Sequence, residues 1–532
     1  MSVANTRPAD FDSAGGAPHH HRRSADSRAY SWSYFSTAAP AWKEFSTMRA
    51  PWRLAILLAA FLFDAWAGPR GGAAAHAAEL HIGAGTISIT PDQPVALSGQ
   101  MRTRISQRVD SPVIASVLAL ESREGPRSLD QAIMVACDLV AISEGLIDSV
   151  RAKLKDRLPD LDPRKVFLSA THTHTAPETI EGQYHLPESG ILRPEAYAQF
   201  LAERVVQAIE QAWRARRPGS VGWGLGHAVV AQNRLAVSRD GRAKMYGPTA
   251  APSFDRFEGY EDHGVEVLCF WDGADKLIAT AINVACPAQE VEGKSTVDAD
   301  FWHPVRESLR KQYGDQLVVL GWTGAAGDQS PHLMFRNSAE ERMRSLRGLD
   351  RLQEIARRIV AAWQEAYAGA VKEKHADAPL VHRVETLELP IRQVTHEEAL
   401  AAKTKVAEVA DDPDSHWIRL WHQRVVDRFE RQKPEDVYRA EIHVLRLGDV
   451  AIATNPFELY TDYGVRMKAR SPALQTFVIQ LAGPGTYLAT ERGTAGGSYG
   501  AVIQSNIVGP EGGRVLVERT LDVIGELWPP GK

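Results

Sequence analysis

Short apolar runs separated by polar turns recur from about residue 80 to the end of the chain, and this pattern predicts a series of strands. Most runs are of strand length and almost wholly apolar, as in 165–170, which is typical of buried strands. The strands predicted in this way are 113–120, 131–140, 165–170, 265–271, 277–284, 316–321, 380–389, 440–447, 450–454 and 475–481.

Longer segments with an apolar residue every three or four positions lie between several of these runs and predict helices. In the first of them Val150 and Leu154 fall on one face, and Ser143 is the expected N-cap. The helices predicted are 143–158, 194–215, 341–368 and 397–432, the last broken near residue 412. Because strands alternate with helices and some connections are short, we expect an α/β fold with mixed β-sheets flanked by helices.

The first 78 residues differ from the rest of the chain. Residues 1–47 lack sustained periodicity, so we expect a disordered leader that is not translated if synthesis starts at Met48. Residues 48–78 have the basic, apolar and small-residue order of a signal peptide, with cleavage expected near Ala77. The protein is therefore predicted to be secreted or periplasmic, and an uncleaved membrane anchor is the alternative. Residues 79–532 are expected to form a single domain.

Composition and charge mainly exclude classes of function. A net charge of −5 over 532 residues, with no basic block that contains aromatic residues, argues against a nucleic-acid partner. Three cysteines are too few for a disulfide scaffold. Cys137 and Cys269 lie in apolar runs and are expected to be buried free thiols, whereas Cys286 lies in a polar turn. The chain has no Gly-x-Ser-x-Gly motif, which argues against an α/β-hydrolase.

The segment Thr171-His172-Thr173-His174-Thr175 directly follows the strand predicted at 165–170. Two histidines at positions i and i+2 can point to one place only if the strand ends there. Strand ends are where α/β enzymes collect their catalytic groups, and neutral imidazole is a common zinc ligand. A lone His-x-His segment is also common on surfaces without a metal, so it carries weight only together with other polar segments.

Four further polar segments follow predicted strands in the same way. Each one alone is weak, because every strand ends in a turn. Polar groups that recur just past strand ends predict one concave site built from several loops. These segments are 283–289, 324–331, 454–458 and 483–487.

Together these segments resemble the neutral, non-lysosomal ceramidases, which are zinc amidases that hydrolyse the N-acyl bond of ceramide. The resemblance extends from about Gly83 to Leu527 and implies a ceramidase-type catalytic domain without the family's C-terminal immunoglobulin-like domain. Tyr499 follows Tyr487 by twelve positions, like a second active-site tyrosine of the family. The segments that carry the resemblance are 83–91, 171–174, 327–331, 456–458 and 487–490.

Carried over one position at a time, the resemblance implies that His172, Glu458 and Tyr487 bind Zn²⁺. It implies that His174 and Tyr499 donate hydrogen bonds to the oxyanion of the tetrahedral intermediate. Zinc lowers the pKa of a bound water to about 7, and each oxyanion donor commonly contributes on the order of 3 kcal/mol. This chemistry is sensible for amide hydrolysis at neutral pH.

The chain departs from the family pattern at two positions. Cys286 stands where the family has a further histidine ligand, and Leu235 stands where it has a serine beside the zinc. A thiolate binds zinc well, so we expect Cys286 to complete the ligand set. The alternatives are that the metal is lost, that His303 supplies the missing imidazole, or that Cys286 is a nucleophile. The residues expected around the ligands without binding the metal are Asp328, His303, Asn233 and Arg234.

The leading hypothesis is an exported zinc-dependent hydrolase of amide (N-acyl) bonds that acts on a small-molecule or lipid amide, with a role in sphingolipid metabolism implied by the resemblance. Loss of the family serine weakens ceramide itself as the substrate. One alternative is a non-catalytic binding protein on the same fold. The other is a cysteine-dependent acyl hydrolase that uses Cys286 with His172 or His174 as base. Membrane contact is left open, because the mature sequence does not indicate it.

Overall fold

The computed structural model describes residues 78–528. The leader predicted at 1–47 and almost all of the signal peptide predicted at 48–78 lie outside the described residues, so both stay predictions. Among residues 78–528, the helices are too short or too polar to cross a lipid bilayer.

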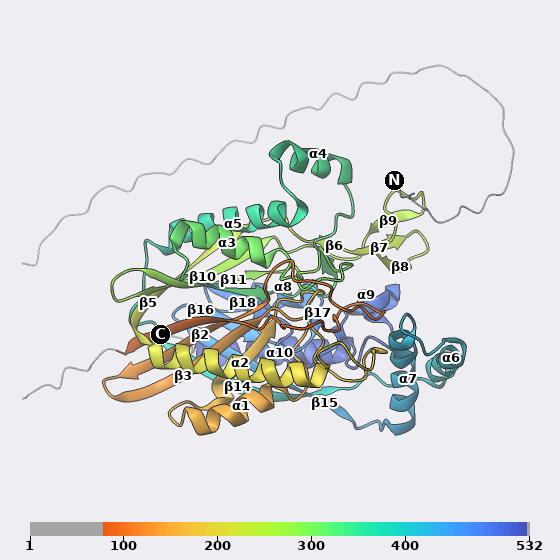
Figure 1. Ribbon diagram of the computed structural model, residues 1–532, viewed down its shortest axis with the longest axis horizontal. Coiled ribbons are helices and arrows are strands. Elements are labelled where there is room, and N and C mark those ends of the chain that lie inside the picture. The colour runs from red at the N-terminus through yellow and green to blue at the C-terminus, as the bar shows by residue number, and fades with distance from the viewer. Residues whose placement is uncertain (1–77, 529–532) are drawn as a thin grey trace, which may run out of the picture. The chain divides into compact units, whose positions relative to one another are not determined.

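A mixed sheet of eight strands forms the centre of the fold (Figure 1). Its strands lie in the order β12, β11, β10, β5, β1, β2, β3, β4. The pairs β3–β4 and β11–β12 are parallel, and the other neighbours are antiparallel. The strands are β1 (Glu79–Ser88), β2 (Ile114–Glu124), β3 (Arg127–Cys137), β4 (Val166–Ala170), β5 (Arg217–His227), β10 (Gly264–Asp272), β11 (Leu277–Val284) and β12 (Val318–Thr323).

A second sheet of four strands packs against one face of the first. Side chains of β2 point alternately to the two faces of the first sheet. Leu118 and Leu120 pack with Ile452 and Phe477 of the second sheet in one core cluster, whereas Val117 belongs to the core on the opposite face. The central strands are therefore buried on both faces, which explains their almost continuous apolar sequences. The second sheet contains β14 (Leu380–Pro390), β15 (Val437–Leu447), β16 (Val450–Thr454) and β18 (Gln475–Ile479), in that order.

Helices cover the outer faces of both sheets and complete a four-layer arrangement (Figure 1). On the eight-stranded sheet lie α1 (Leu146–Arg157), α2 (Pro194–Ala215), α3 (Trp302–Tyr313) and α5 (Arg351–Ala370). On the four-stranded sheet lie α8 (Thr461–Arg470) and α10 (Pro510–Leu527). The remaining helices are α4 (Asn337–Arg347), α6 (His396–Glu408), α7 (His416–Arg431) and α9 (Glu491–Gly496), with 3₁₀ turns at Pro163–Lys165 and Tyr499–Ala501.

Small sheets lie in the loops. They contain β6 (Gln232–Asn233), β7 (Leu235–Ser238), β8 (Ala243–Met245), β9 (Phe254–Phe257), β13 (Gln329–Ser330), β17 (Glu458–Leu459) and β19 (Tyr487–Leu488).

Three parallel strand pairs direct their following loops to one edge of the two sheets. The pairs β3–β4, β11–β12 and β16–β18 are each joined by a crossover that contains a helix: α1, α3 and α8 respectively. Their carboxyl ends meet: Thr323 Oγ1 donates to the carbonyl of Ala170 (3.2 Å), and Gln480 N donates to the carbonyl of Thr323 (3.0 Å). Loops that are distant in sequence are therefore brought together at this edge.

The structure confirms the α/β class with mixed sheets, and each predicted strand coincides with an observed one. Two helix predictions are wrong in detail. Segment 341–368 is split into α4 and α5, because Gly348 ends α4 in a left-handed conformation (φ 66°). Helix α1 begins at Leu146 after Gly145 (φ 80°), so Ser143 is not its N-cap.

Two buried histidines couple stability to pH. His382 Nε2 lies 2.9 Å from His443 Nδ1 between β14 and β15, and both side chains are buried. Burial lowers the pKa of both rings, and that of His382 falls well below its usual value. Below about pH 6.5 the unfolded chain takes up protons that the folded chain does not. The free energy of unfolding should therefore fall as the pH decreases from about 7 to 5, by up to about 1.4 kcal/mol per pH unit for each histidine.

Urea denaturation at about pH 7 and about pH 5 measures this dependence. The variant His382→Gln should make the free energy of unfolding less dependent on pH. The matched control is His396→Gln, at an exposed histidine, and it should retain the dependence of the wild type. Equal pH dependence in all three proteins would contradict the prediction.

Candidate active site

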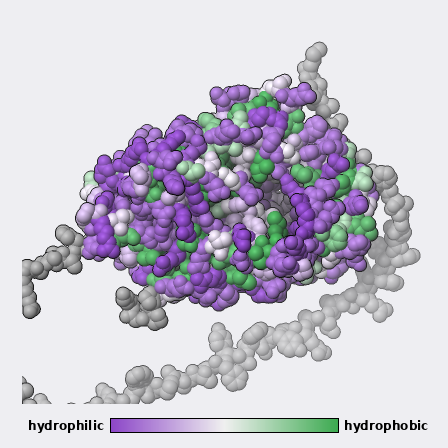
Figure 2. Space-filling model, turned by 90° about the horizontal axis from the view of Figure 1, so that it is seen from below, coloured by the Kyte–Doolittle hydropathy of each residue, from purple (hydrophilic) through white to green (hydrophobic). Residues whose placement is uncertain are grey.

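Side chains from the loops at this edge line a cavity of about 510 Å³. Six residues expected from the sequence are part of its wall: His172, His174, Arg234, Glu458, Tyr487 and Tyr499. Another part of the wall is apolar and includes Leu139, Ile142, Ile180 and Trp417. The molecular face in Figure 2 is largely hydrophilic and has a hollow with hydrophobic residues along part of its rim. A cavity with these two kinds of wall suits a ligand that has one polar and one apolar part.

His172 is held in a single orientation at the end of β4. Its backbone adopts a left-handed conformation (φ 66°), which is rare for a residue with a side chain and is often found at functional sites. Its Nδ1 lies 2.7 Å from the carbonyl oxygen of Val140, so the ring donates its proton there. The unprotonated Nε2 then faces the Glu458 carboxylate at 3.3 Å.

Glu458 and Tyr487 lie beside each other because β17 and β19 pair in parallel at these two residues. Burial opposes the charge of Glu458, but the Tyr487 hydroxyl and the positive charge of Arg234 keep its pKa below the usual value. Gly327 permits this packing, because a Cβ atom there would lie 2.4 Å from the Glu458 carbonyl oxygen. His172, Glu458 and Tyr487 therefore lie together on the cavity wall.

Arg234 supplies a buried positive charge to the same wall. Its Nη2 donates to the Tyr487 hydroxyl (3.1 Å) and to the Gly327 carbonyl (2.9 Å), and its Nη1 lies 3.3 Å from Gln289 Oε1. The guanidinium is almost fully buried, so its orientation is determined by these contacts. Arg234 thus holds the phenol of Tyr487 next to Glu458.

Asn233 and Asp328 lie behind the cavity wall. Asn233 Nδ2 donates to Asp328 Oδ2 (2.9 Å), and Asp328 Oδ1 accepts from the backbone and hydroxyl of Thr461. Neither Asn233 nor Asp328 belongs to the described residues that line the cavity. They connect the loops after β5, β12 and β16, and in this way they position Arg234 and Glu458.

The structure does not bring Cys286 to the other three predicted ligands. Its side chain is fully buried in the core cluster that contains Phe301 and Trp302, and its Sγ contacts the carbonyl of Pro287 (3.6 Å). Burial raises the pKa of its thiol well above the usual value, which disfavours a thiolate for metal binding or nucleophilic attack. His303 lies in the first turn of α3 and is likewise absent from the cavity wall as described.

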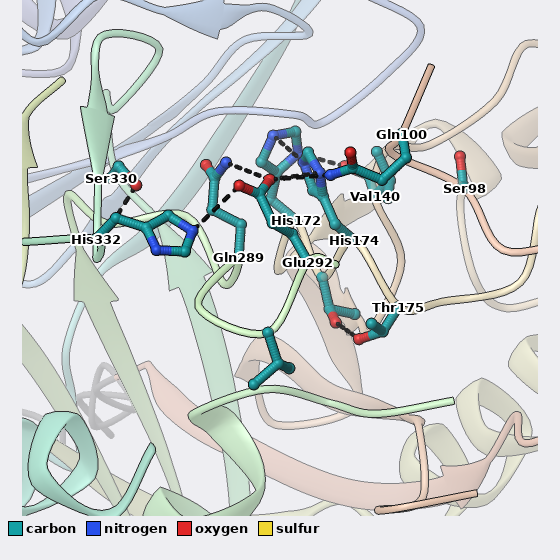
Figure 3. Close-up of polar contacts among 12 residues, drawn as sticks. Ser98, Gln100, Val140, His172, His174, Thr175, Gln289, Glu292, Ser330 and His332 are labelled. Atoms are coloured by element: carbon teal, nitrogen blue, oxygen red, sulfur yellow. Dashed lines mark hydrogen bonds and ion pairs between the residues drawn. The ribbon is translucent and has the colours of Figure 1, made fainter. Parts of the chain in front are cut away.

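Glu292 is a residue of the cavity wall that sequence reasoning missed. Its Oε2 lies 3.3 Å from His174 Nδ1 and accepts from the amides of Gln100 (3.3 Å) and Gln289 (3.2 Å), and its Oε1 lies 3.1 Å from His332 Nε2 (Figure 3). Burial opposes its charge, but His174 and His332 hold its pKa well below the usual value. An ionised carboxylate is therefore aimed at the ring of His174.

His174 and Tyr499 complete the wall. The His174 ring fits against Gly99 (φ 93°), where a Cβ atom would lie 2.5 Å from its Cγ. Its Nε2 lies 3.2 Å from His172 Nε2. The Tyr499 ring meets the Tyr487 ring edge to face, with 5.6 Å between the centroids. Leu235, in contrast, is buried in the core, so no side chain at this position enters the cavity wall.

Comparison of the sequence with family models and with curated proteins finds no match. The fold, in contrast, is shared with the crystal structure of neutral ceramidase from Pseudomonas aeruginosa, with a TM-score of 0.61, 19% identity, and coverage of 84% of this chain and 74% of that chain. A structure of ceramidase complexed with C2 gives a TM-score of 0.61 at 18% identity, covering 85% of this chain and 75% of that chain. The chain therefore has the neutral ceramidase fold, which confirms the fold that the sequence resemblance implied.

Proposed function

We propose that this protein is a zinc-dependent hydrolase of amide (N-acyl) bonds. The observation that carries the proposal is the convergence of His172, Glu458 and Tyr487 on one cavity wall, with His174 next to them. The neutral ceramidase fold supports the same function. The signal peptide predicted at 48–78 would direct the enzyme to the periplasm or outside the cell.

The residues of this wall fit a zinc ion. Nε2 of His172 and Oε2 of Glu458 both carry free electron pairs and face each other at 3.3 Å, an arrangement that a cation stabilises. Histidine nitrogen and carboxylate oxygen are usual zinc ligands, and the Tyr487 oxygen would be the third. When bound, zinc supplies a water of lowered pKa and polarises the scissile carbonyl.

The remaining residues hold and move protons. Burial lowers the pKa of His174, so its ring carries one proton at neutral pH. Nδ1 lies 3.3 Å from Glu292 Oε2, and when the proton is on Nδ1, Nε2 is free to accept a proton from the attacking water and to return it to the departing amine. This role differs from the donor role that the sequence resemblance implies for His174. Burial raises the pKa of Tyr499, so its phenol stays protonated and can donate to the oxyanion.

The apolar part of the wall indicates the substrate class. Leu139, Ile142 and Trp417 would cover an acyl chain or another apolar group and exclude water from the reacting bond. A cavity of about 510 Å³ accepts a substrate of moderate size. We therefore propose a small-molecule or lipid N-acyl amine as the substrate.

The direct test combines metal analysis with hydrolysis of N-acyl amines that differ in acyl-chain length. The purified protein should contain zinc and release free amine, and a chelator should remove both zinc and activity. Addition of Zn²⁺ after chelation should restore the activity. Protein that neither retains zinc nor cleaves any of these amides would support the alternative of a non-catalytic binding protein.

Cys286→Ala is expected to leave hydrolysis within roughly twofold of the wild type and the zinc content unchanged, because the thiol lies in the core and outside the cavity wall. Loss of the buried sulfur should lower the free energy of unfolding by about 1 kcal/mol. Urea denaturation, metal analysis and amine release measure the three quantities. A selective loss of activity, or an acyl adduct trapped on Cys286, would instead favour a cysteine-dependent hydrolase.

A further inference from the structure

A second group of metal-ligating side chains lies outside the cavity, where the loop at 182–185 meets the connection between α6 and α7. His185, Asp411 and His416 each place one nitrogen or carboxylate oxygen within 4.8 Å of the other two. The rings of His185 and His416 meet edge to face, with 6.2 Å between their centroids. We propose that these three residues bind a zinc ion that is distinct from the one in the candidate active site.

The contacts around the group orient its ligand atoms. Nε2 of His416 lies 3.3 Å from the carbonyl of Gly182, and Nδ1 forms a hydrogen bond with Asp411 Oδ1, so a bound cation would take the place of the proton between these two atoms. The second oxygen of Asp411 accepts from Arg419 Nη1 (3.3 Å). Ligating histidines and carboxylates are commonly held in this way by a carbonyl and by a hydrogen-bond donor.

The chemistry of the donor set favours zinc. Two imidazoles and one carboxylate suit a small, borderline-soft divalent cation, whereas calcium and magnesium prefer sites made of oxygen alone. Three protein ligands leave the fourth tetrahedral position to water. The positive charge of Arg419 lowers the affinity, so this zinc should be removed by a chelator more easily than one held at a buried site.

The position of the group suggests what the metal does. Gln183 and Tyr184, which precede His185, line the cavity, and so does Trp417, which follows His416. Thr103 already joins the same segments, because its backbone N donates to the Pro413 carbonyl (2.9 Å) and its hydroxyl to the His185 carbonyl (3.1 Å). A bound zinc ion would clamp these two segments of the cavity wall together.

Titration of the full chain with ZnCl₂ tests the proposal, with bound zinc measured after dialysis and the melting temperature measured in parallel. The wild type should bind one zinc per chain more than His185→Asn or His416→Asn, and added zinc should raise its melting temperature more. Because all of these proteins contain His19, His20 and His21, any zinc held there contributes equally to each. His185 is exposed and His416 is only half-buried, so both variants should fold, which circular dichroism verifies.

The matched control is His422→Asn, on the same helix α7 but outside the group, and it should bind zinc like the wild type. The titration is repeated with Glu458→Gln, in which the candidate active site lacks a ligand. In this background, the chain with His185 should still bind one zinc more than the chain with His185→Asn. A failure of the proposed second site can in this way be distinguished from a failure of the candidate active site. Equal zinc content in the wild type, His185→Asn and His416→Asn, or an equal loss in His422→Asn, would overturn the proposal.

Discussion

Glu458→Gln is expected to remove zinc from the candidate active site and to lower the rate of N-acyl hydrolysis by more than about 100-fold. Loss of a residue that only orients a metal ligand typically costs about 10- to 100-fold, and loss of a ligand should cost more. The amide has the shape of the carboxylate but not its charge, so Nε2 of His172 loses its anionic partner. The buried positive charge of Arg234 would then lie close to the metal position without the compensating charge of Glu458, and this opposes binding of a cation. Metal analysis and amine release measure the two effects.

The matched control is Glu258→Gln. Glu258 is also a buried glutamate, but it pairs with Arg492 and is outside the described cavity wall. Its variant should retain zinc and activity, even if its melting temperature falls. If Glu458→Gln folds, keeps its zinc and hydrolyses N-acyl amines at the wild-type rate, the proposed metal centre is wrong.

Ten strands of the two large sheets could be predicted from the sequence, because burial makes their residues almost continuously apolar. Strands β1 and β5 were not predicted, because many of their positions are not buried and their apolar pattern is interrupted. Four helices of the described residues were not predicted: α3, α8, α9 and α10. Helices α8 and α10 contain glycines that lower helix propensity, and these glycines serve tertiary packing. A Cβ atom at Gly464 would lie 2.5 Å from Ala325 Cβ, and one at Gly513 would lie 2.4 Å from the Tyr463 hydroxyl. Close approach of each helix to its neighbour outweighs the local preference, and only the folded chain reveals this.

The candidate site was predictable where its residues sit in motifs at strand ends, as His172, Glu458 and Tyr487 do. The direction in which the Cys286 side chain points could not be predicted. Its backbone N bonds to the carbonyl of Val284 (2.7 Å), and this tight turn directs the side chain into the core between β11 and α3. No pattern of residue types in the sequence specifies such a turn, so the spacing alone made Cys286 look equivalent to a ligand.

Glu292 illustrates a different limit of sequence reasoning. Its significance comes from contacts with Gln100 and His174, which lie far away in the sequence, and its own neighbours in the chain give no periodic or motif signal. Glu290, two positions earlier, has a similar local setting, but it pairs with Arg351 and lies 4.0 Å from the other nitrogen of His332. Only the meeting of the loops after β4 and β11 distinguishes the two carboxylates.

The contact of Glu292 with His174 leads to the second prediction of a large effect on activity. Glu292→Gln is expected to lower kcat about 100-fold and to leave KM within roughly threefold, because proton transfer by a positioned histidine contributes about 10²- to 10⁴-fold. The amide no longer favours the proton on Nδ1 of His174, so Nε2 is less often free to accept one from water. Steady-state kinetics with one N-acyl amine measures kcat and KM separately.

Zinc content separates this positioning role from a structural one. Because Glu292 faces His174 and not the three proposed ligands, Glu292→Gln should keep its zinc and its cooperative unfolding while kcat falls. Glu290→Gln, two positions earlier and also partly buried, should keep kcat because its carboxylate contacts Arg351. A fall in kcat that is matched by loss of zinc would assign Glu292 to support of the metal site, and an unchanged kcat would show that the tautomer of His174 does not depend on it. Because the tautomer determines whether Nε2 accepts or donates a proton, these two variants decide between a proton-transferring His174 and an oxyanion donor.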